Sequence, residues 1–578
     1  MTKLIFRFLF LMLASLSLPA CDKEETLNSL TVSPAEAKFG KNPGSTDLAV
    51  QTNAGSWTIT NPAPEWLELS KSSGTADATV TVSVSTRTKE ARNATLMVAA
   101  GNAKPVEVKV SQQASEFLFN LSADAANIGF DVAGGAKHLQ ITTDADGWEV
   151  TADADWLDFS LESGSTGSTA LDIIASPNTG ATRNATVSIS ATDAQTIQVS
   201  VTQQGSQYPN YNVSPIAPDA TGMSSNATEL AAKIKLGWNA GNSLEAIGSE
   251  TAWGNPKISK ALIDLVKQNG FNAVRLPCSW NQYMENSSTA KLKDDWMNRV
   301  KEVVQYCVDN DMYVLLNIHW DGGWLENNCT PEKQDANNAK QRAFWQQIAT
   351  HLRDFDEHVM FASANEPNVE NATQMTVLSS YHQTFVNAVR ETGGKNSYRV
   401  LVVQGPSTDI EKTNNLMATL PTDEIENRLM AEIHYYTPWN FCGLTEDASW
   451  GKMFYYWGDG YHSATDTERN ANWGEEDLVN TNFQLMKTKF VDKGVPVIMG
   501  EFSVVRRSSL TGDALTKHLA SRAYYLKYVT AQARAHGIIP FYWDNGATGN
   551  NGSAIFRRDN NTVFDQQALD AMIEGSGQ

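Results

Sequence analysis

The strongest constraint on the fold is a regular alternation of short apolar runs with amphipathic stretches in the C-terminal part of the chain. Eight apolar runs follow one another, at 234–239, 273–277, 313–319, 359–366, 399–405, 429–436, 496–502 and 538–545. Stretches with helical periodicity, such as 258–268 and 373–390, separate most of them. Eight strand-helix units in succession predict a (β/α)8 TIM barrel, whose active site lies at the C-terminal ends of the strands.

Polar and aromatic side chains lie at or near the C-terminal ends of these runs. They are Arg275, His319, Asn365, Glu366, His434, Tyr436, Glu501 and Trp543. A polar group so deep in an apolar run is costly unless it has a partner. Any one of them is equally well explained as a satisfied buried residue, but eight on one rim of one barrel predict an active site.

The two glutamates suit the cleavage of a glycosidic bond, which needs a proton donor and a second carboxylate. Glu366 ends the fourth run and Glu501 is the second-last residue of the seventh, so a barrel would place them across its mouth, near the roughly 5 to 5.5 Å that retention requires. We expect an ion pair to keep one carboxylate ionised and burial to raise the pKa of the proton donor. No metal-ligand pattern accompanies them, and this reaction needs no cofactor.

Five short motifs carry a resemblance to glycoside hydrolase family 5, in particular to its endoglucanase and xyloglucanase branch, subfamily 4. The motifs are LGWNAGNSL at 236–244, VRLP at 274–277, ANEP at 364–367, HYY at 434–436 and GEF at 500–502. Asn-Glu-Pro alone is a modest signal, but the set in this order is highly specific. The resemblance covers the region from Ala231 to Gly546.

The resemblance implies a retaining endo-β-1,4-glucanase with Glu366 as the acid/base and Glu501 as the nucleophile. It also implies that Tyr436 and Arg275 hold the nucleophile by hydrogen bonds. The substrates that it implies are plant cell-wall β-glucans: cellulose-type glucan, mixed-linkage glucan or xyloglucan.

Further residues are implied to bind the substrate. Asn365 would contact the 2-hydroxyl of the sugar in subsite −1, His319 and His434 would line that subsite, and Trp543 would form its floor. We place Asn239 and Trp324 in the same group. One departure from the family pattern is Trp320, which follows His319 where many members carry a second histidine.

Other tryptophans near the strand ends bear on the length of the cleft. They are Trp253, Trp280, Trp320, Trp324, Trp439, Trp450 and Trp457. Each is as readily a core residue as a sugar platform. A cleft paved by several of them would favour cutting inside a polysaccharide chain.

Three other functions compete with the glucanase. An endo-β-1,4-mannanase differs only in the 2-hydroxyl that the site must accept, which the sequence does not decide. A surface glycan-binding lipoprotein without catalysis would lack one of the two glutamates, and both are present. An esterase would need a Gly-x-Ser-x-Gly elbow, and the barrel region has none.

The N-terminal part carries an internal repeat with a period near 91 residues. WTIT at 57–60 recurs as WEVT at 148–151, and RNAT at 92–95 recurs at 183–186. Each copy is a series of short alternating strands between turn residues, which predicts two immunoglobulin-like β-sandwiches at 27–115 and 116–206. The copies resemble the BACON module that precedes many Bacteroidetes glycanases.

The repeated tryptophans have two possible roles. Trp57, Trp66, Trp148 and Trp156 lie among alternating strand residues at equivalent places. This placement favours core packing over sugar binding, so that the two modules act as a stalk. A linker at 207–224 then leads to the catalytic domain at 225–578.

The first residues resemble a bacterial lipoprotein signal. Lys3 and Arg7 precede a short apolar stretch that ends in Leu-Pro-Ala-Cys21, which predicts a signal peptide at 1–20 and a lipid on Cys21. Acidic residues at 22–25 resemble an export signal for the outer face of the outer membrane. We therefore expect a lipid-anchored protein on the cell surface.

Charge and cysteine content limit the remaining partners. The net charge of −20 would repel nucleic acid, and we expect a monomer whose partner is a β-linked polysaccharide. The other four cysteines, Cys278, Cys307, Cys329 and Cys442, form no metal-binding or disulfide pattern. The sequence does not decide whether Cys329 and Cys442 form a single disulfide bridge.

Overall fold

The computed structural model describes residues 26–178 and 180–578. The chain divides into two compact units, the first reaching Gln204 and the second beginning at Gly205, with residues 180 and 181 assigned to the second. The signal peptide and Cys21 lie outside the described residues. Within the described ranges, no helix combines the length and apolarity that a membrane span requires.

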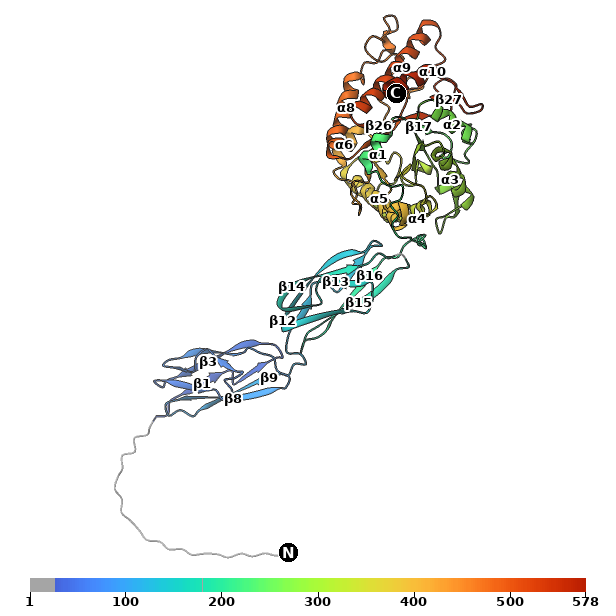
Figure 1. Ribbon diagram of the computed structural model, residues 1–578. Helices are drawn as coiled ribbons and strands as arrows, with labels where there is room; N and C mark the ends of the chain where they lie inside the picture. The colour runs from blue at the N-terminus through green and yellow to red at the C-terminus, as the bar shows by residue number, and fades with distance from the viewer. Residues whose placement is uncertain (1–25, 179) are drawn as a thin grey trace, which may run out of the picture. The chain divides into compact units, whose positions relative to one another are not determined.

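The first repeat copy forms two packed sheets (Figure 1). One has the order β1 (Leu30–Ser33), β3 (Gly44–Thr52), β7 (Ala78–Val84), β5 (Glu68–Leu69). The other has the order β2 (Glu36–Phe39), β9 (Val106–Gln112), β8 (Arg92–Ala100), β4 (Trp57–Thr60), β6 (Ser73–Gly74). Alternate strand residues form one core between the sheets, as the period-two pattern predicts.

The second copy hydrogen-bonds into a single seven-stranded sheet around its own core. Its main path is β11 (Asn127–Phe130), β16 (Ile197–Gln203), β15 (Arg183–Ser190), β12 (Gly135–Ala152), β14 (Ser163–Ala175), β13 (Leu157–Phe159), with β10 (Leu121–Ala123) beside β12. The second copy has one sheet where the first has two, because its long strand β12 pairs with both β14 and β15. A register shift between Thr143 and Gly147 lets it do so.

The repeated tryptophans pack in the cores, as expected. Trp57, Trp66 and Trp148 are buried, and Trp156 is half-buried at the edge of its core. The guanidinium of Arg92 lies 4.5 Å above the Trp66 ring, and that of Arg183 lies 4.4 Å above Trp156. These cation–π pairs explain why the repeat keeps an arginine together with its tryptophan.

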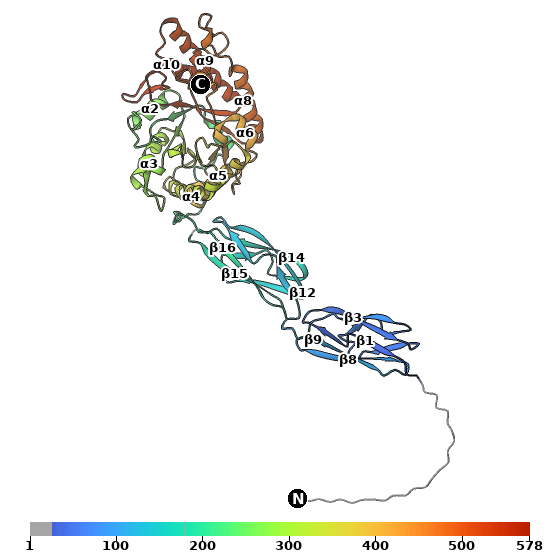
Figure 2. The same ribbon diagram turned by 180° about the vertical axis from the view of Figure 1, so that it is seen from behind.

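The second unit contains a closed barrel of eight parallel strands surrounded by helices (Figures 1 and 2). Its strands, in order, are β17 (Gly237–Ala240), β18 (Ala273–Leu276), β21 (Tyr313–Asn317), β22 (Val359–Ala362), β23 (Leu401–Gln404), β24 (Leu429–Tyr435), β25 (Val497–Phe502) and β26 (Ile538–Asp544). Parallel pairing of β17 with β26 closes the barrel. Seven strands lie within the predicted runs and β17 extends one residue beyond its run, at Ala240, so the predicted barrel is confirmed.

Helices follow the barrel strands as the alternating pattern predicts. The longer ones are α2 (Lys260–Gln268), α3 (Asp294–Val308), α4 (Gln334–His351), α5 (Ala372–Glu391), α8 (Glu476–Lys489), α9 (Gly512–Ala535) and α10 (Gln566–Gly575). The short helices are α1 (Ala227–Lys233), α6 (Ile410–Leu416) and α7 (Trp439–Cys442). A main apolar cluster joins the helices to the outer face of the strands.

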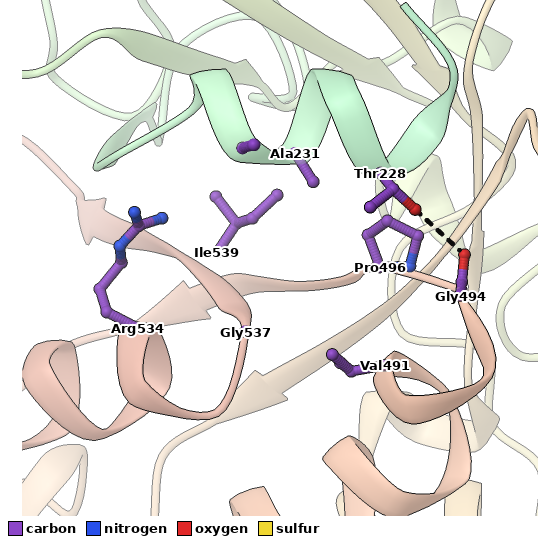
Figure 3. Close-up of a pocket in the computed structure, with 9 residues that line it drawn as sticks. Thr228, Ala231, Val491, Gly494, Pro496, Arg534, Gly537 and Ile539 are labelled. Carbon is purple, nitrogen blue, oxygen red and sulfur yellow. Dashed lines mark hydrogen bonds between the residues drawn. The ribbon is translucent and has the colours of Figure 1, made fainter.

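Helix α1 covers the N-terminal end of the barrel. Its Ala227 and Leu230 join a buried cluster of residues from the barrel strands, among them Met360 and Ile539. A cavity of about 240 Å³ lies between α1 and the starts of β25 and β26, where Thr228 Oγ1 donates to Gly494 O at 3.2 Å (Figure 3). This face is opposite to the C-terminal strand ends, so the cavity is separate from the predicted active site.

The stretch expected as a linker packs closely against the barrel unit. Tyr208 is 8% exposed and belongs to the main core. The backbone N–H of Tyr211 donates to Gln346 Oε1 at 2.9 Å, and its hydroxyl donates to Thr289 O at 2.8 Å. Ile216 pairs with Gly393 in a short β-bridge. The segment that begins at Gly205 is therefore part of the catalytic unit.

Truncation tests this packing. A protein beginning at Gly205 should keep the stability and turnover of the barrel in the full chain, whereas one beginning at Pro215 should lose roughly 3 to 5 kcal/mol, because it lacks two packed tyrosines. Urea unfolding, with activity on soluble polymer, measures both. Tyr211→Phe, which removes only one hydroxyl hydrogen bond, is the control and should lose about 1 kcal/mol. Equal stability of the two truncations would contradict this role of the segment.

Candidate active site

Glu366 and Glu501 meet at the C-terminal mouth of the barrel. Glu366 follows β22, and Glu501 lies near the end of β25. Together with His434 they offer donor atoms that all lie within 4.8 Å of one another. Glu501 is nearly buried, and the side chain of Glu366 remains 40% exposed. The two carboxylates are thus close enough for a double displacement on one sugar.

Arg275, in the middle of the barrel wall on β18, organises the floor of this site. Its Nη1 donates to Glu501 Oε1 at 2.8 Å and to Asn239 Oδ1 at 3.1 Å, and its Nη2 donates to Asn365 Oδ1 at 2.9 Å. Burial alone would lower the pKa of Arg275, but the charges of Glu432 and Glu501 raise it. The spacing of the donor atoms would also suit a metal ion, but here the guanidinium supplies the positive charge beside Glu501.

Tyr436 completes the support of Glu501. Its hydroxyl donates to Glu501 Oε2 at 2.8 Å, so each carboxylate oxygen accepts one hydrogen bond. Burial and the negative charge of Glu501 raise the pKa of Tyr436 well above its ordinary value. The phenol therefore stays protonated and acts only as a donor to the carboxylate.

His434, two residues before Tyr436 on the inward face of β24, contacts three carboxylates. Its Nδ1 lies 2.7 Å from Glu366 Oε1, and its Nε2 lies 3.3 Å from Glu432 Oε1. Burial alone would lower the pKa of His434, but the charge of Glu501 and the hydrogen bonds to the other two carboxylates raise it to about 9. At neutral pH the ring is therefore an imidazolium that donates from both nitrogens.

The pKa of Glu366 differs from our expectation. We expected burial to raise the pKa of the proton donor. Burial does act in that direction, but the hydrogen bond from His434 and the charges of His434 and Arg275 outweigh it, so the pKa lies below its ordinary value. The sequence argument considered burial alone for this pKa, and it did not predict that His434 would donate a hydrogen bond to this carboxylate.

His319 and Trp543 form the aromatic side of the site. Their rings are stacked, with centroids 5.7 Å apart and planes inclined by 5°. Burial and the positive charges of Arg275 and His434 hold the pKa of His319 well below its ordinary value. His319 is therefore a neutral ring beside a cationic one, and it can accept or donate a hydrogen bond to a sugar hydroxyl.

Two of the residues expected to bind substrate have other contacts. Asn239 is fully buried, and its Nδ2 donates to Gly500 O at 2.8 Å, so it positions Arg275 and the end of β25 without reaching the cleft. Trp324 donates to Asp321 Oδ2 at 2.9 Å, and its half-buried ring packs against Phe344 at 5.6 Å. These contacts place Trp324 beside α4.

The other tryptophans divide into core and surface residues. Trp280 and Trp457 are completely buried and belong to the core. Those with large exposed surface are Trp253, Trp320, Trp439, Trp450 and Trp473. All five lie in the connections that follow β17, β21 and β24, with Trp439 in the short helix α7, at the end of the barrel that holds the glutamates. Trp473 was absent from our expectations, because it lies far along a loop from the nearest strand.

Three polar residues of the site were missed. Glu432 precedes His434 by two residues, so an inward period of two on β24 was an available signal. Gln404 ends β23 and donates to Glu432 Oε2 at 2.5 Å. Glu326 lies on the loop after β21 and accepts from Glu366 N–H at 3.1 Å and from Asn365 Nδ2 at 3.3 Å. Nothing in the sequence marks Glu326.

The cysteines have no part in this site. Cys278, Cys307, Cys329 and Cys442 are all free and buried, so the possible bridge between Cys329 and Cys442 is not formed. Burial raises the pKa of each thiol. The four therefore behave as small core residues.

Glu326 gives a testable pH dependence. Burial raises its pKa from 4.5 to about 7, so the folded state favours the neutral carboxyl. The resulting stabilisation is complete below pH 4.5 and is lost as the pH rises through 7. Glu326→Gln, which mimics the neutral form, should therefore be more stable than the parent at pH 8 by up to roughly 3 kcal/mol. The difference should vanish near pH 4.5.

Urea unfolding of the two proteins across this pH range measures that difference, and the titration of all other groups cancels in it. A variant that is less stable than the parent at pH 8 would mean that the charged carboxylate has a partner that these contacts do not include.

Comparison with known families agrees with this architecture. The family described as "Cellulase (glycosyl hydrolase family 5)" matches residues 239–549. The BACON family, described as "Putative binding domain, N-terminal", matches residues 55–113 and 146–204. The two BACON matches fall within the two repeat copies.

Individual relatives extend the comparison over most of the chain. The xyloglucan-specific endo-β-1,4-glucanase of Bacteroides ovatus is 35% identical over 78% of this chain and 90% of its own length. Endoglucanase A of Paenibacillus barcinonensis is 37% identical over 60% of this chain and 90% of its own. A solved structure of a Bacteroides ovatus family 5 xyloglucanase with a XXXG heptasaccharide has a TM-score of 0.60 and 32% identity, covering 80% of this chain and all of that one.

Proposed function

Since the chain belongs to glycosyl hydrolase family 5 and is an endo-β-1,4-glucanase, we propose that it cleaves xyloglucan with retention of configuration. Glu366 is the acid/base, and Glu501 is the nucleophile. The observation that carries this assignment is the approach of the two carboxylates to within 4.8 Å. An inverting enzyme needs a wider gap, because a water must fit between the carboxylate and the sugar.

The first half-reaction uses the bonds around Glu501. One of its oxygens attacks the anomeric carbon, the bond to the leaving oxygen breaks, and Glu366 donates its proton to that oxygen. Arg275 and Tyr436 hold both oxygens of Glu501, which fixes the carboxylate in position before the attack. Asn365, fixed by Arg275, is placed to contact the sugar in the same subsite.

The second half-reaction returns the enzyme to its starting state. Glu366, now a carboxylate, removes a proton from water, and the water oxygen attacks the anomeric carbon as the bond to Glu501 breaks. Two inversions give a product with the configuration of the substrate. His319 and Trp543 line the side of the subsite, where the indole offers an apolar face to the sugar ring.

The preference for xyloglucan rests on the relatives and on the surface around the mouth. The Bacteroides ovatus relative is named a xyloglucan-specific enzyme, and other similar structures are titled broad-specificity endoglucanases. Exposed indoles on three loops at the same end, including Trp253, Trp320 and Trp450, offer stacking faces beyond the reacting sugar. Such faces suit a long chain with side branches better than a short chain end.

Hydrolysis of a panel of polymers tests this proposal. The full chain is incubated with xyloglucan, mixed-linkage glucan, carboxymethylcellulose and mannan, with Glu501→Ala as the inactive control. We expect the highest kcat/KM on xyloglucan, a fall in viscosity before many reducing ends form, and β-configured ends first in NMR spectra. Faster turnover of mannan, or α-configured first products, would overturn the proposal.

We also propose that the protein is anchored to the outer face of the outer membrane by a lipid on Cys21. The support is the sequence alone: a basic start, a short apolar stretch, Leu-Pro-Ala-Cys21 and the acidic residues that follow. Buried tryptophans in the two BACON modules favour a spacer role over sugar binding for these modules. Such a spacer would separate the enzyme from the membrane.

Replacing Cys21 with Ser tests the anchor. The variant should retain its kcat on xyloglucan but leave the membrane fraction, because the thiol that accepts the lipid is absent. Protease treatment of intact cells measures surface exposure of the parent protein. Membrane association of Cys21→Ser would mean that another anchor exists.

A further inference from the structure

We infer that Glu432 is a positioning residue for the acid/base: through His434 it keeps a transferable proton next to Glu366. This role rests on the assignment of Glu366 made above. The three side chains form a row, in which His434 Nε2 lies 3.3 Å from Glu432 Oε1 and His434 Nδ1 lies 2.7 Å from Glu366 Oε1. One ring thus joins a buried carboxylate to an exposed one.

Glu432 is fixed in place more firmly than a packing residue needs to be. It is completely buried on β24, and its Oε1 lies 2.9 Å from Nε of Arg275. Its Oε2 accepts from Gln404 Nε2, whose Oε1 in turn accepts from the backbone N–H of Ala364, just before Asn365 and Glu366. Glu432 is therefore connected to the acid/base both through His434 and through the backbone.

Gly500 makes room for this carboxylate. A Cβ added at residue 500 would lie 1.9 Å from Glu432 Oε1, so a larger residue there would displace it. A buried carboxylate is expensive, and a charge that reaches no substrate needs a reason to be there. The charges of Arg275 and His434, together with the bond from Gln404, hold the pKa of Glu432 below its ordinary value although burial opposes this.

The proton inventory explains the arrangement. In the resting pair Glu366 is ionised and His434 carries the shared proton. The first half-reaction needs that proton on Glu366. Transfer breaks the Nδ1–H bond of His434 and forms an O–H bond on Glu366. The ring left behind is neutral and keeps its Nε2–H directed at Glu432. When Glu366 later takes a proton from water, the reverse transfer restores the imidazolium.

The charges around His434 show what Glu432 contributes. Carboxylates face the ring from three elements: Glu366 after β22, Glu432 on β24 and Glu501 on β25, with Glu501 Oε2 3.8 Å from Nδ1. The positive charge of Arg275 on β18 opposes them, with Nη2 3.4 Å from Nε2, and His319, just after β21, is neutral. Tyr436, the residue after β24, is an uncharged phenol. Of the three carboxylates, only Glu432 has no other part in the reaction.

The test compares Glu432→Gln with the parent full chain by the pH profile of kcat/KM. Without the charge of Glu432 the pKa of His434 should fall, so the ring should lose the shared proton at a lower pH. The basic limb of the profile should therefore move to lower pH by roughly 1 to 3 units. A second readout uses two leaving groups. Turnover of xyloglucan should fall at least about tenfold more than turnover of an aryl glycoside with an acidic phenol, which needs little protonation.

A matched control separates this role from general damage. Glu250 is another buried carboxylate paired with an arginine, 2.8 Å from Arg299, and it lies outside the site. Glu250→Gln should lose stability but keep the pH profile and the ratio between the two substrates. If Glu432→Gln does not fold, Glu432→Asp is measured in its place, and its basic limb should shift in the same direction by a smaller amount.

Two results would overturn the inference. An unshifted basic limb in a folded Glu432 variant would show that the carboxylate does not hold the proton of His434. Equal losses on both substrates would show that Glu432 acts only by supporting Arg275 and Glu501. Both results leave the assignment of Glu366 intact, because Glu366→Ala tests that assignment separately.

Discussion

Replacing Glu501 with glycine should lower kcat on xyloglucan by about 10⁵ to 10⁶-fold, the scale of loss when a hydrolase loses its nucleophile. We do not expect Glu432, which is fully buried, or Glu366, the proposed acid/base, to take its place. Single-turnover measurements with an aryl glycoside should then show no glycosyl-enzyme.

Azide gives this variant a specific signature. The glycine leaves space where the carboxylate stood, and azide can attack the anomeric carbon from there, so the product should be the α-glycosyl azide. Arg275 keeps its ion pair with Glu432, which helps the variant to fold. Thermal unfolding checks that it does. A β-glycosyl azide from this variant would mean that Glu501 is not the nucleophile.

The eight strands were predictable because each requires only local information. A buried parallel strand is a short apolar run, and polar residues at its C-terminal end are exceptions that stand out against it. The runs at 273–277 and 313–319, for example, contain strands β18 and β21. Closing the barrel then brings Arg275, Glu366 and Glu501 together, as the fold class requires.

What the sequence did not predict depends on contacts between distant segments. The pKa of Glu366 is set by His434, which is 68 residues further along the chain. Asn239 sits at the end of a predicted strand, but its amide is used by the backbone of two neighbouring strands. Likewise Tyr208 and Tyr211 follow turn-rich residues that are typical of a linker, and only the barrel surface decides that they pack. The sequence pattern predicts the strand or helix on which a residue lies, but the residues that it contacts in the fold determine its role.

Glu366 is the residue whose removal should separate the two half-reactions. Glu366→Ala should lower kcat on xyloglucan by about 10² to 10⁴-fold, because a sugar leaving group needs a proton. An aryl glycoside with an acidic phenol needs little protonation, so its first step should be nearly as fast as in the parent. The second step lacks its base, and the glycosyl-enzyme on Glu501 should accumulate. A burst of phenol followed by slow turnover measures this.

Azide then identifies the face that Glu366 occupies. It needs no general base, and the alanine opens the side from which water normally attacks, so azide should speed turnover of the aryl glycoside and give the β-glycosyl azide. The side chain of Glu366 is 40% exposed, so this approach is open. Glu501→Gly gives the opposite anomer, so the two variants control each other. Exchanged anomers in their NMR spectra would reverse the assignment, because the stereochemistry of each product records which side of the sugar lost its carboxylate.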